Sequence, residues 1–459
     1  MEFETLLIST YELGRQPFGL ASPVAWLRKA GVQVNCLDLA LDKLDENLVR
    51  RAGLIAFYLP MHTATRIATR VIPAVRKLNP EAHLCAYGLY APVNATLLKE
   101  LGIQTILGGE FEEGLRNLAI RIRRHKTPPL DAAQPEPFVS LGRQAFLPPE
   151  RDGLPLLGKY AKLNLPDGST RVVGYTEASR GCKHQCRHCP IVPVYHGTFR
   201  IVQREVVLED IRRQVGMGAQ HITFGDPDFF NGIGHAIPLL EQLHREHPQL
   251  SYDVTIKVEH LLKHADALGT LRDTGCAFVT SAIESLDDRV LQILDKGHTR
   301  ADFVRLVEIF RGMGLPLIPT FVAFTPWTTL EGYEDLLLLL ARLGQEEHVA
   351  PIQLAIRLLI PSGSLLLERP EVQAVIGPFD QRALSYHWKH PDPRVDELQR
   401  RVEVLVRKAS AARRSRREIF QEVWRILHDV MQQQPQHLPP IFPGQARATI
   451  PYLTEPWFC

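Results

Sequence analysis

The sequence predicts an α/β protein with an N-terminal doubly wound parallel sheet, a partial (β/α)6 barrel of the TIM type and a helical C-terminal extension. Short apolar runs alternate with helical patterns over residues 1–126 and again, in longer units, over 168–376. A proline-rich stretch at 127–167 separates the two regions. Alternating strands and helices form parallel sheets, because each helix returns the chain to the edge where the next strand begins.

The first region is expected to fold as a doubly wound sheet over residues 1–126. Its apolar runs have the length of buried strands, and its helical runs end at a glycine or at a change of pattern. Sheets of this type bind ligands at the carboxyl ends of their strands. The expected strands are Thr5–Thr10, Gln33–Ala40, Leu54–Leu59, His83–Tyr87 and Gln104–Leu107, and the expected helices are Ser22–Gly31, Asp42–Ala52, Ala64–Leu78 and Val93–Leu101.

A linker is expected at residues 127–167, where prolines are dense between Pro128 and Pro155. Proline lacks an amide hydrogen and cannot continue a helix or an inner strand. The barrel is expected at 168–376, because βα units resume there. Its expected strands are Val172–Ala178, His221–Phe224, Ser251–Lys257, Phe278–Ile283, Leu317–Phe324 and Gln353–Leu359, with helices that include Glu205–Met217, Ile233–His247, Leu286–Leu294 and Ala301–Gly312.

Residues 377–459 form the expected C-terminal extension. The helical pattern of Arg394–Met431 is long enough for two helices and carries a basic run from Arg407 to Arg417. We interpret this run as a solvated helical face, in preference to a surface for RNA or anions. The remaining residues, from Pro435, are proline-rich and expected to be extended.

Composition excludes several classes of protein. Hydrophobic residues make up 45% and charged residues 23% of the 459 residues, and the formal net charge is +2. These values are typical of a globular protein, and nothing in the charge indicates a nucleic-acid or membrane-surface partner. No apolar run approaches the roughly 20 residues that cross a bilayer, and the acidic N-terminus does not resemble a secretory signal. We therefore expect a cytoplasmic protein without a membrane partner.

Three of the seven cysteines lie within eight residues, as Cys182, Cys186 and Cys189 in the spacing C-x3-C-x2-C. This motif follows the first expected strand of the barrel, and barrels place active sites in the loops after their strands. Three thiolates suit an iron–sulfur cubane with one open iron. A structural zinc site is the alternative, and it needs a fourth ligand such as His184 or His188. Cys36, Cys85 and Cys276 lie in apolar runs and are expected in the core.

At this loop the sequence resembles the radical S-adenosylmethionine (SAM) enzymes, whose C-x3-C-x2-C motif has an aromatic residue or histidine before the last cysteine, here His188. The resemblance implies that Cys182, Cys186 and Cys189 hold a [4Fe-4S] cluster whose open iron binds SAM. It also implies an electron donor such as flavodoxin or ferredoxin. The reduced cluster would cleave SAM to methionine and a 5′-deoxyadenosyl radical, so that the cofactor carries the difficult chemistry.

The same resemblance suggests further SAM contacts. Gly225 and Asp226, in ITFGDPDFFNG, would bind the amino group of SAM, although a simple Gly-Asp-Pro turn explains them equally well. Lys257, in TIKVEHL, would contact a carboxylate or the ribose, with a surface lysine as the alternative.

Two later barrel segments complete the expected site. Ser281, Glu284 and Ser285, in TSAIESLDDRVLQILDKGHT, would face the nucleoside of SAM. The alternative is that Ser285 or Asp287 only caps the following helix. Arg357 places a charge inside an apolar run and needs a partner, for which the carboxylate of SAM or of a substrate is one candidate.

The N-terminal region followed by RDGLPLLGKY resembles the cobalamin-binding-like domain of one radical SAM class, and GGEFEEGL at Gly108–Leu115 matches a segment near the end of that domain. Proteins that bind cobalamin through a histidine carry D-x-H-x-x-G after the first strand, whereas Ser9–Gly14 contains no histidine. The domain is expected either to bind cobalamin without a protein ligand to cobalt, or to keep only the fold and recognise substrate.

The final residues, LTEPWFC, resemble the radical SAM family named for a CUAEP/CCAEP tail, in which a second cysteine or selenocysteine follows the first. One interpretation is that the gene continues after Cys459 through a selenocysteine codon, and the other is an ordinary terminus with a free thiol. Such a pair would be a soft donor set for a thiophilic element such as arsenic.

The sequence therefore predicts a radical SAM enzyme that acts on an unidentified small molecule by methylation, rearrangement or carbon–heteroatom bond formation. Transfer of the 3-amino-3-carboxypropyl group of SAM is an alternative reaction. The alternative outside enzymes is an iron–sulfur or cobalamin sensor whose basic helix contacts nucleic acid.

Overall fold

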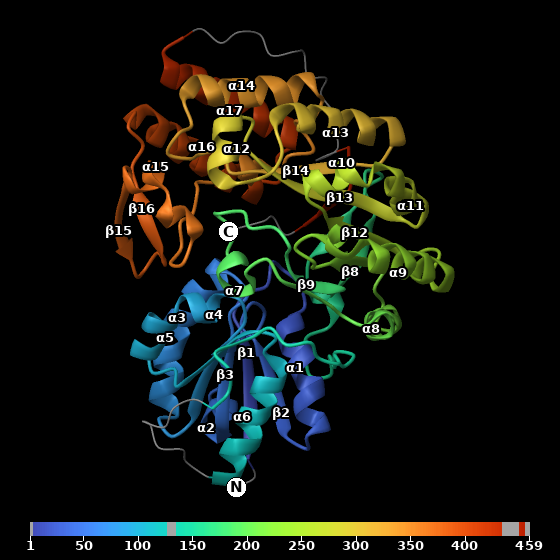
Figure 1. Ribbon diagram of the computed structural model, residues 1–459, viewed down its shortest axis with the longest axis vertical. Helices are drawn as coiled ribbons and strands as arrows, with labels where there is room; N and C mark the ends of the chain where they lie inside the picture. The colour runs from blue at the N-terminus through green and yellow to red at the C-terminus, as the bar shows by residue number, and fades with distance from the viewer. Residues whose placement is uncertain (1–2, 126–134, 434–448, 455–459) are drawn as a thin grey trace.

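The computed structural model describes residues 3–125, 135–433 and 449–454. An α/β layer with a parallel sheet forms one end of the molecule, and a second, curled sheet with its helices lies beside it (Figure 1). The C-terminal helices cover the far end of the second sheet in the same view. This arrangement confirms the predicted fold class, while the domain bounds given above stay a prediction.

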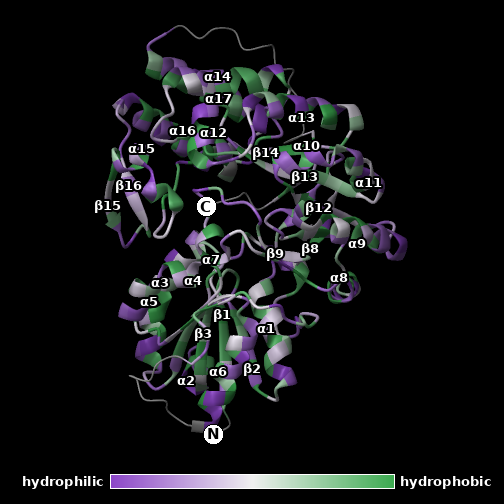
Figure 2. Cartoon of the chain, viewed as in Figure 1, coloured by the Kyte–Doolittle hydropathy of each residue, from purple (hydrophilic) through white to green (hydrophobic). Residues whose placement is uncertain are grey.

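The N-terminal sheet has the strand order β2-β1-β3-β4-β5-β6, and all its pairs are parallel. Strand β1 (Glu4–Ser9) is buried on both faces, because Leu7 packs into one core and Leu6 and Ile8 pack into the other. Figure 2 shows these apolar strands between the two helical layers. The other strands are β2 (Gln33–Asp38), β3 (Ala52–Tyr58), β4 (His83–Tyr87), β5 (Thr105–Gly109) and β6 (Val139–Ser140).

Helices α1 (Phe18–Lys29) and α6 (Glu112–His125) cover one face of this sheet. The other face is covered by α2 (Glu46–Arg51), α3 (His62–Leu78), α4 (Tyr90–Val93) and α5 (Ala95–Glu100). Helix α2 begins later than expected, because the side chain of Asp45 caps it by accepting from the amides of Asn47 and Leu48. The helix expected at Val93–Leu101 is two short helices that meet at Asn94.

The second sheet has the order β14-β13-β12-β11-β8-β7-β17. Its four inner pairings run parallel from β8 to β14, and β7 and β17 extend the β8 edge in the antiparallel sense. Its strands are β7 (Lys162–Asn164), β8 (Thr170–Thr176), β11 (His221–Phe224), β12 (Ser251–Thr255), β13 (Cys276–Glu284), β14 (Leu317–Phe321) and β17 (Tyr452–Leu453).

One large core fills the space between this sheet and its helices. The short hairpin of β9 (Ser179–Gly181) and β10 (Phe199–Ile201) lies outside the sheet, together with α7 (Val192–Tyr195). The remaining barrel helices are α8 (Arg204–Gly216), η2 (Phe229–Gly232), α9 (Ile233–Glu246), α10 (Val258–Lys263), η3 (Ala265–Ala267), α11 (Leu268–Asp273), α12 (Asp288–Leu294), α13 (Arg300–Met313) and α14 (Leu330–Arg342).

The sixth barrel strand, expected at Gln353–Leu359, is a wrong prediction. Pro351–Leu354 forms the 3-10 helix η4, and the only strand-type pairing of this stretch among the described residues is a single parallel bridge between Phe324 and Arg357. The side-chain oxygen of Gln353 accepts from the amide of Phe321 at 3.0 Å and takes the place of a backbone acceptor at the β14 edge. Proline at 351 removes the amide that a neighbouring strand would need.

The C-terminal extension contains the two helices that were expected, α16 (Pro393–Ala411) and α17 (Arg416–Met431). They follow η5 (Leu365–Glu368), α15 (Pro370–Gln373) and the antiparallel pair β15 (Ile376–Asp380) and β16 (Ser385–Trp388). The basic run is mostly paired with protein oxygen: Arg407 with Glu403, Arg414 with Glu422 and Arg417 with Glu347. Arg416 is buried and donates to the carbonyl of Glu347, so it is not part of a solvated face.

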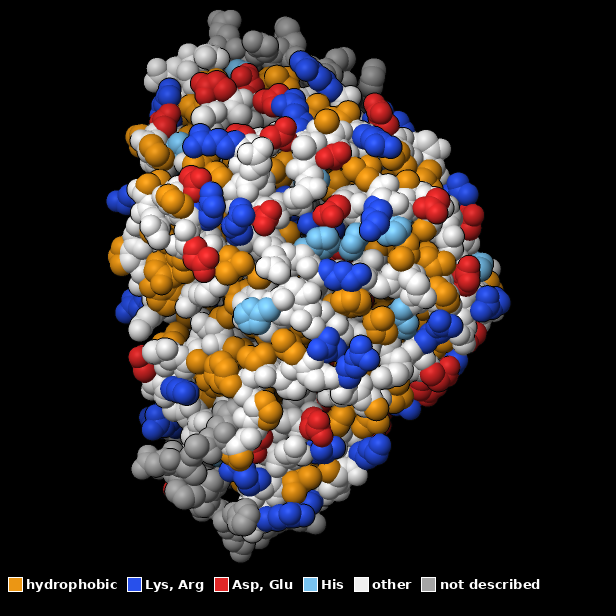
Figure 3. Space-filling view, in the orientation of Figure 1, with side chains coloured by type: hydrophobic (Ala, Val, Ile, Leu, Met, Phe, Trp, Pro, Cys, Tyr) orange, Lys and Arg blue, Asp and Glu red, His pale blue; other side chains and the backbone are white. Residues whose placement is uncertain are grey.

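Charges of both signs are interspersed over the face shown in Figure 3. Among the described residues, no helix combines the length and the apolar character that a membrane span requires. The linker residues that the structure describes contribute β6 to the first sheet and β7 to the second, and the 3-10 helix η1 (Leu157–Lys159) lies between them.

Candidate functional site

The three clustered cysteines lie in the loop that follows β8 and β9, as the sequence predicts. Gly181 ends β9 with a φ of +72°, directly before Cys182. A Cβ atom at Gly181 would lie 2.4 Å from the carbonyl oxygen of Thr198, because the β10 backbone approaches closely at this point. Glycine is therefore required to turn the chain into the cysteine loop.

The three thiols occupy a sheltered place. Cys186 is buried and Cys182 and Cys189 are half-buried. Burial raises the pKa of Cys189 to about 12, and the neighbouring thiols of Cys186 and Cys182 add to the rise. Burial likewise raises the pKa of Cys182. A thiol with a raised pKa loses its proton when it binds a metal ion, because the ligand is the thiolate. Three such thiols in one loop fit the donor set of an iron–sulfur cluster.

Both ends of the cysteine loop are anchored to barrel elements. The side-chain oxygen of Asn231, in η2, accepts from the amide of Lys183 at 3.2 Å. At the other end, Arg187 donates from its amide to the carbonyl of Leu294 and from its guanidinium to the carbonyl of Gln292, both in α12. These bonds fix the loop between the ends of two βα units, where barrels place their active sites.

Gly225 and Asp226 follow β11, and the structure brings Asp226 to the segment before the cysteines. The Asp226 carboxylate accepts from the amide of Ala178 at 2.9 Å and from the hydroxyl of Ser179 at 2.5 Å. Burial raises the pKa of Asp226 to about 7. A Cβ at Gly225 would lie 1.8 Å from the hydroxyl of Tyr175, so glycine is required there. Asp226 thus positions the strand that leads into the cysteine loop.

Glu284 ends β13 with a φ of +69° and contacts an imidazole and an ammonium group. Its carboxylate lies 3.2 Å from His188 and 3.4 Å from the ammonium of Lys296. Burial opposes its ionisation, but Lys296 and His188 prevail and lower the pKa of Glu284 to about 2. His188 is the residue before Cys189, so this cluster links the cysteine loop to β13. Ser281, also on β13, is fully buried and its hydroxyl has no hydrogen-bond partner.

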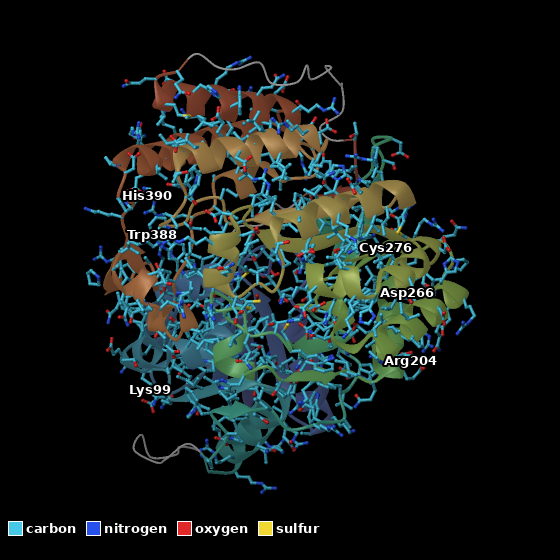
Figure 4. The ribbon with its side chains drawn as sticks, turned by 45° about the horizontal axis from the view of Figure 1, so that its top comes forward. Lys99, Arg204, Asp266, Cys276, Trp388 and His390 are labelled. Atoms are coloured by element: carbon cyan, nitrogen blue, oxygen red, sulfur yellow. The ribbon has the colours of Figure 1, made fainter. Side chains whose placement is uncertain are left out.

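Lys257 and Arg357 have protein partners. The ammonium of Lys257 lies 3.0 Å from Nδ1 of His184 and 3.3 Å from the Glu259 carboxylate. Arg357 pairs with Asp396 of α16 at 2.6 Å and donates to the carbonyl of Trp388. Its guanidinium also lies 3.5 Å from the centre of the Trp388 ring. The charge of Arg357 therefore finds its partners in the C-terminal extension. One of these partners, Trp388, lies on the opposite side of Figure 4 from Cys276 and Asp266.

Sequence reasoning missed several residues around the cysteine loop. Lys296 stands in the quoted segment LDKGHT but was not singled out, and Asn231 and His260 are inconspicuous in the sequence. Arg180, two residues before Cys182, is buried and paired with Glu110, Glu112 and Glu177. The sequence feature that could have pointed to Arg180 is the GGEFEEGL segment, because Glu110 and Glu112 in this segment are partners of Arg180.

The sequence pattern of the Radical SAM superfamily matches residues 176–341, from the end of β8 to α14. This part of the chain is therefore similar to radical SAM enzymes. The chain is 24% identical over 336 residues to the hopanoid C-3 methylase of Methylococcus capsulatus, and the aligned region covers 70% of this chain and 64% of that protein. It is also 24% identical over 176 residues to the ribosomal protein uS12 methylthiotransferase RimO of Bacteroides thetaiotaomicron. This second alignment covers 35% of this chain and 39% of that protein. The chain thus spans less than two thirds of either relative.

Two solved structures share the fold of this chain. The radical S-adenosylmethionine methyltransferase TsrM from Kitasatospora setae matches with a TM-score of 0.65 and 16% identity, over 99% of this chain and 94% of that one. The cobalamin-dependent S-adenosylmethionine radical enzyme OxsB matches with a TM-score of 0.69 and 14% identity, over 89% of this chain and 67% of that one. At these identities the likeness concerns the fold alone.

The match to this superfamily implies a [4Fe-4S] cluster and SAM as cofactors. Its three loop cysteines match the donor set that such a cluster needs.

Proposed function

We propose that this radical SAM enzyme is a cobalamin-dependent methyltransferase whose cluster is held by Cys182, Cys186 and Cys189. The observation that carries the proposal is the fold likeness to TsrM over nearly the whole of both chains, including the N-terminal sheet. One TsrM structure contains cobalamin and a [4Fe-4S] cluster, and the relative from Methylococcus capsulatus is named a methylase. When bound, the cluster and SAM supply reductive chemistry, and cobalamin supplies a carrier for a methyl group.

The two sheets meet at the place where these cofactors would have to cooperate. Arg180, directly before the cysteine loop, pairs with Glu110 at 3.2 Å and with Glu112 at 2.7 Å. Both glutamates follow β5, so the carboxyl edge of the N-terminal sheet faces the cysteine loop. A ligand at that edge would lie beside the cluster, which is the side on which doubly wound sheets bind ligands.

The carboxyl end of β1 offers buried polar atoms that suit the amide groups of a corrin. The hydroxyl of Ser9 and Oε2 of Glu12 are buried, and neither has a hydrogen-bond partner among the described residues. Burial, with Glu177 nearby, raises the pKa of Glu12 well above its ordinary value and so favours the protonated acid, which can donate as well as accept. Since Ser9–Gly14 contains no histidine, this loop offers no imidazole to cobalt.

The expected SAM contacts also remain proposals of this article. The hydroxyl of Ser281 and Nδ2 of Asn231, which have no hydrogen-bond partner among the described residues, would bind polar groups of SAM. Glu284 is ionised at neutral pH and would accept from the nucleoside or hold His188 beside the cluster. Gly225 keeps the backbone close to Tyr175, and Lys257 lies at the start of α10 on the same side of the barrel.

The reaction further requires an electron donor such as flavodoxin or ferredoxin and a small-molecule substrate. A reducing compartment keeps the three thiols free for the cluster, which supports the expected cytoplasmic location. Kinship with the CUAEP/CCAEP-tail family is a further proposal, which rests on LTEPWFC alone. Cys459 lies outside the described residues, and the codon after it decides between selenocysteine and a stop.

Anaerobic reconstitution of the full chain tests the proposal. We expect about four irons and four sulfides per chain, retention of about one hydroxocobalamin per chain on gel filtration, and release of S-adenosylhomocysteine and 5′-deoxyadenosine from SAM after reduction. The triple variant C182A/C186A/C189A should lose the brown chromophore and all SAM cleavage, whereas the matched core variant C276A should keep both.

Three results would contradict the proposal. Retention of iron or SAM cleavage by the triple variant would overturn the assignment of the ligands, and uptake of zinc in place of iron by the wild type would overturn the cluster. Methylthioadenosine as the product would indicate 3-amino-3-carboxypropyl transfer instead of methylation.

A further inference from the structure

We propose that His184, Asp228 and His260 form a second metal site, separate from the cysteine ligands, for a divalent ion of the zinc or ferrous type. The three side chains come from three different parts of the barrel. His184 lies in the cysteine loop, Asp228 in the loop after β11, and His260 in α10 after β12. The proposal concerns metal binding alone and does not depend on the methyltransferase function.

The three ligand atoms converge. Nδ1 of His260 lies 2.6 Å and Nε2 of His184 lies 3.4 Å from the same carboxylate oxygen of Asp228, Oδ2. One ligand atom from each residue lies within 4.8 Å of the other two. The two imidazole rings are tilted at 58° with their centres 4.7 Å apart, so they converge from two directions. An ion can approach all three atoms after small movements.

Among the residues that the structure describes, none offers any of the three converging atoms a hydrogen bond of acceptable geometry, although all three atoms are buried. The side chain of Asp228 is 2% exposed, and its other oxygen already accepts from the amide of Phe230. Buried polar atoms are normally satisfied, so three unsatisfied atoms that face one another point to a missing cation. Two imidazoles and one carboxylate form the donor set of catalytic zinc and of non-haem ferrous sites.

The ammonium group of Lys257 lies close enough to the trio to repel a cation bound there. This ammonium lies 3.0 Å from Nδ1 of His184, on the side of the ring that faces away from Asp228. Glu259 offsets this charge, because its carboxylate lies 3.3 Å from the same ammonium. Removing the ammonium should therefore strengthen binding of a dication, whereas a network of hydrogen bonds would be weakened by the same change.

The site would leave coordination positions free. Three protein ligands do not complete the shell of a zinc or ferrous ion, so an oxygen donor such as a carboxylate or hydroxyl group of a bound small molecule can fill it. His184 lies between Cys182 and Cys186, so one of the three proposed metal ligands belongs to the cysteine loop itself.

Zinc binding to the cluster-loaded full chain tests the proposal. After anaerobic reconstitution and desalting, the chain is titrated with Zn²⁺ and counted by mass spectrometry for zinc and iron. We expect about one zinc per chain beyond the cluster iron, at least about tenfold weaker binding in H260Q and in D228N, and tighter binding in K257M. The control H264Q changes a histidine at the end of the same helix that is outside the trio, and should bind zinc like the wild type.

Each other outcome overturns the proposal. Equal zinc binding by the wild type and H260Q would mean that the ion sits elsewhere, and equal loss in H264Q would mean that any change at this end of α10 disturbs the loop. Weaker binding in K257M would identify a hydrogen-bond network. If H260Q and D228N lost the cluster iron together with zinc, the three side chains would hold the cysteine loop in its conformation and would not form a metal site.

Discussion

At the scale of single residues, the contacts of Glu284 explain why a carboxylate can be buried beside the cysteine loop. Lys296 is itself buried and lies 3.4 Å from one carboxylate oxygen of Glu284, and Nε2 of His188 lies 3.2 Å from the same oxygen. The pKa of Glu284 falls to about 2, so the stabilisation is complete above the ordinary pKa of a glutamate and is lost as the pH falls toward 2. The sequence indicated Glu284 but not Lys296, because nothing local marks which lysine turns inward.

Replacing Lys296 by methionine should therefore destabilise the protein near neutral pH. The change leaves a buried carboxylate without its main partner, which typically costs about 3–5 kcal/mol. Chemical denaturation of the cluster-free chain at pH 7 measures the loss. The control K263M removes an exposed lysine of α10 and should change the free energy of unfolding by no more than about 0.5 kcal/mol. An equal effect of the two variants would show that Glu284 does not depend on Lys296.

At the scale of elements, the C-x3-C-x2-C loop depends on the turn that precedes it. Gly181 combines a positive φ with a close approach of the Thr198 carbonyl, and Asp226 ties the preceding residues to the end of β11. The sequence predicted the loop and its place after a strand. It did not predict the β9–β10 hairpin that shapes the loop, because that pairing depends on side-chain contacts distant in sequence.

The variant G181A should reconstitute poorly. A Cβ at this position would meet the Thr198 carbonyl at 2.4 Å, and a left-handed backbone costs an alanine about 1 kcal/mol or more. We expect iron content to fall well below that of the wild type after identical anaerobic reconstitution. The matched control G216A lies in α8 with open space around its Cβ position and should bind iron normally. Full iron content in G181A would show that the loop tolerates a different path.

At the scale of the whole molecule, Arg180 joins the two sheets. Its guanidinium is buried, pairs with Glu110 and Glu112 of the first region and with Glu177 of the second, and lies 5.3 Å from the ring centre of Phe111. Arg151 adds a second junction, because it donates to Gln16 of the first region and pairs with Asp210 of α8. These buried charges hold the carboxyl edge of the first sheet against the cysteine loop.

The variant R180M should loosen the two halves of the molecule. It leaves three carboxylates close together in a buried place without a cation, for which we expect a loss of about 3–5 kcal/mol. Differential scanning calorimetry should show a lower or divided transition, and proteolysis should become faster. The control R272M removes an exposed arginine that pairs only with its neighbour Asp273, and should melt like the wild type. A single transition of unchanged temperature in R180M would refute the junction.

The sequence by itself determined the fold class, the two βα regions and the cysteine loop, because these follow from local periodicity and from a short motif. The tertiary structure alone decided which charges meet: Arg357 with Asp396, Lys296 with Glu284, Arg180 with the glutamates after β5, and His184 with Asp228 and His260. Where the sequence predicts a sixth barrel strand, the structure has a single β-bridge between Phe324 and Arg357. Pairings between residues far apart in the chain depend on how sheets and helices pack, and hydrophobic periodicity carries no information about them.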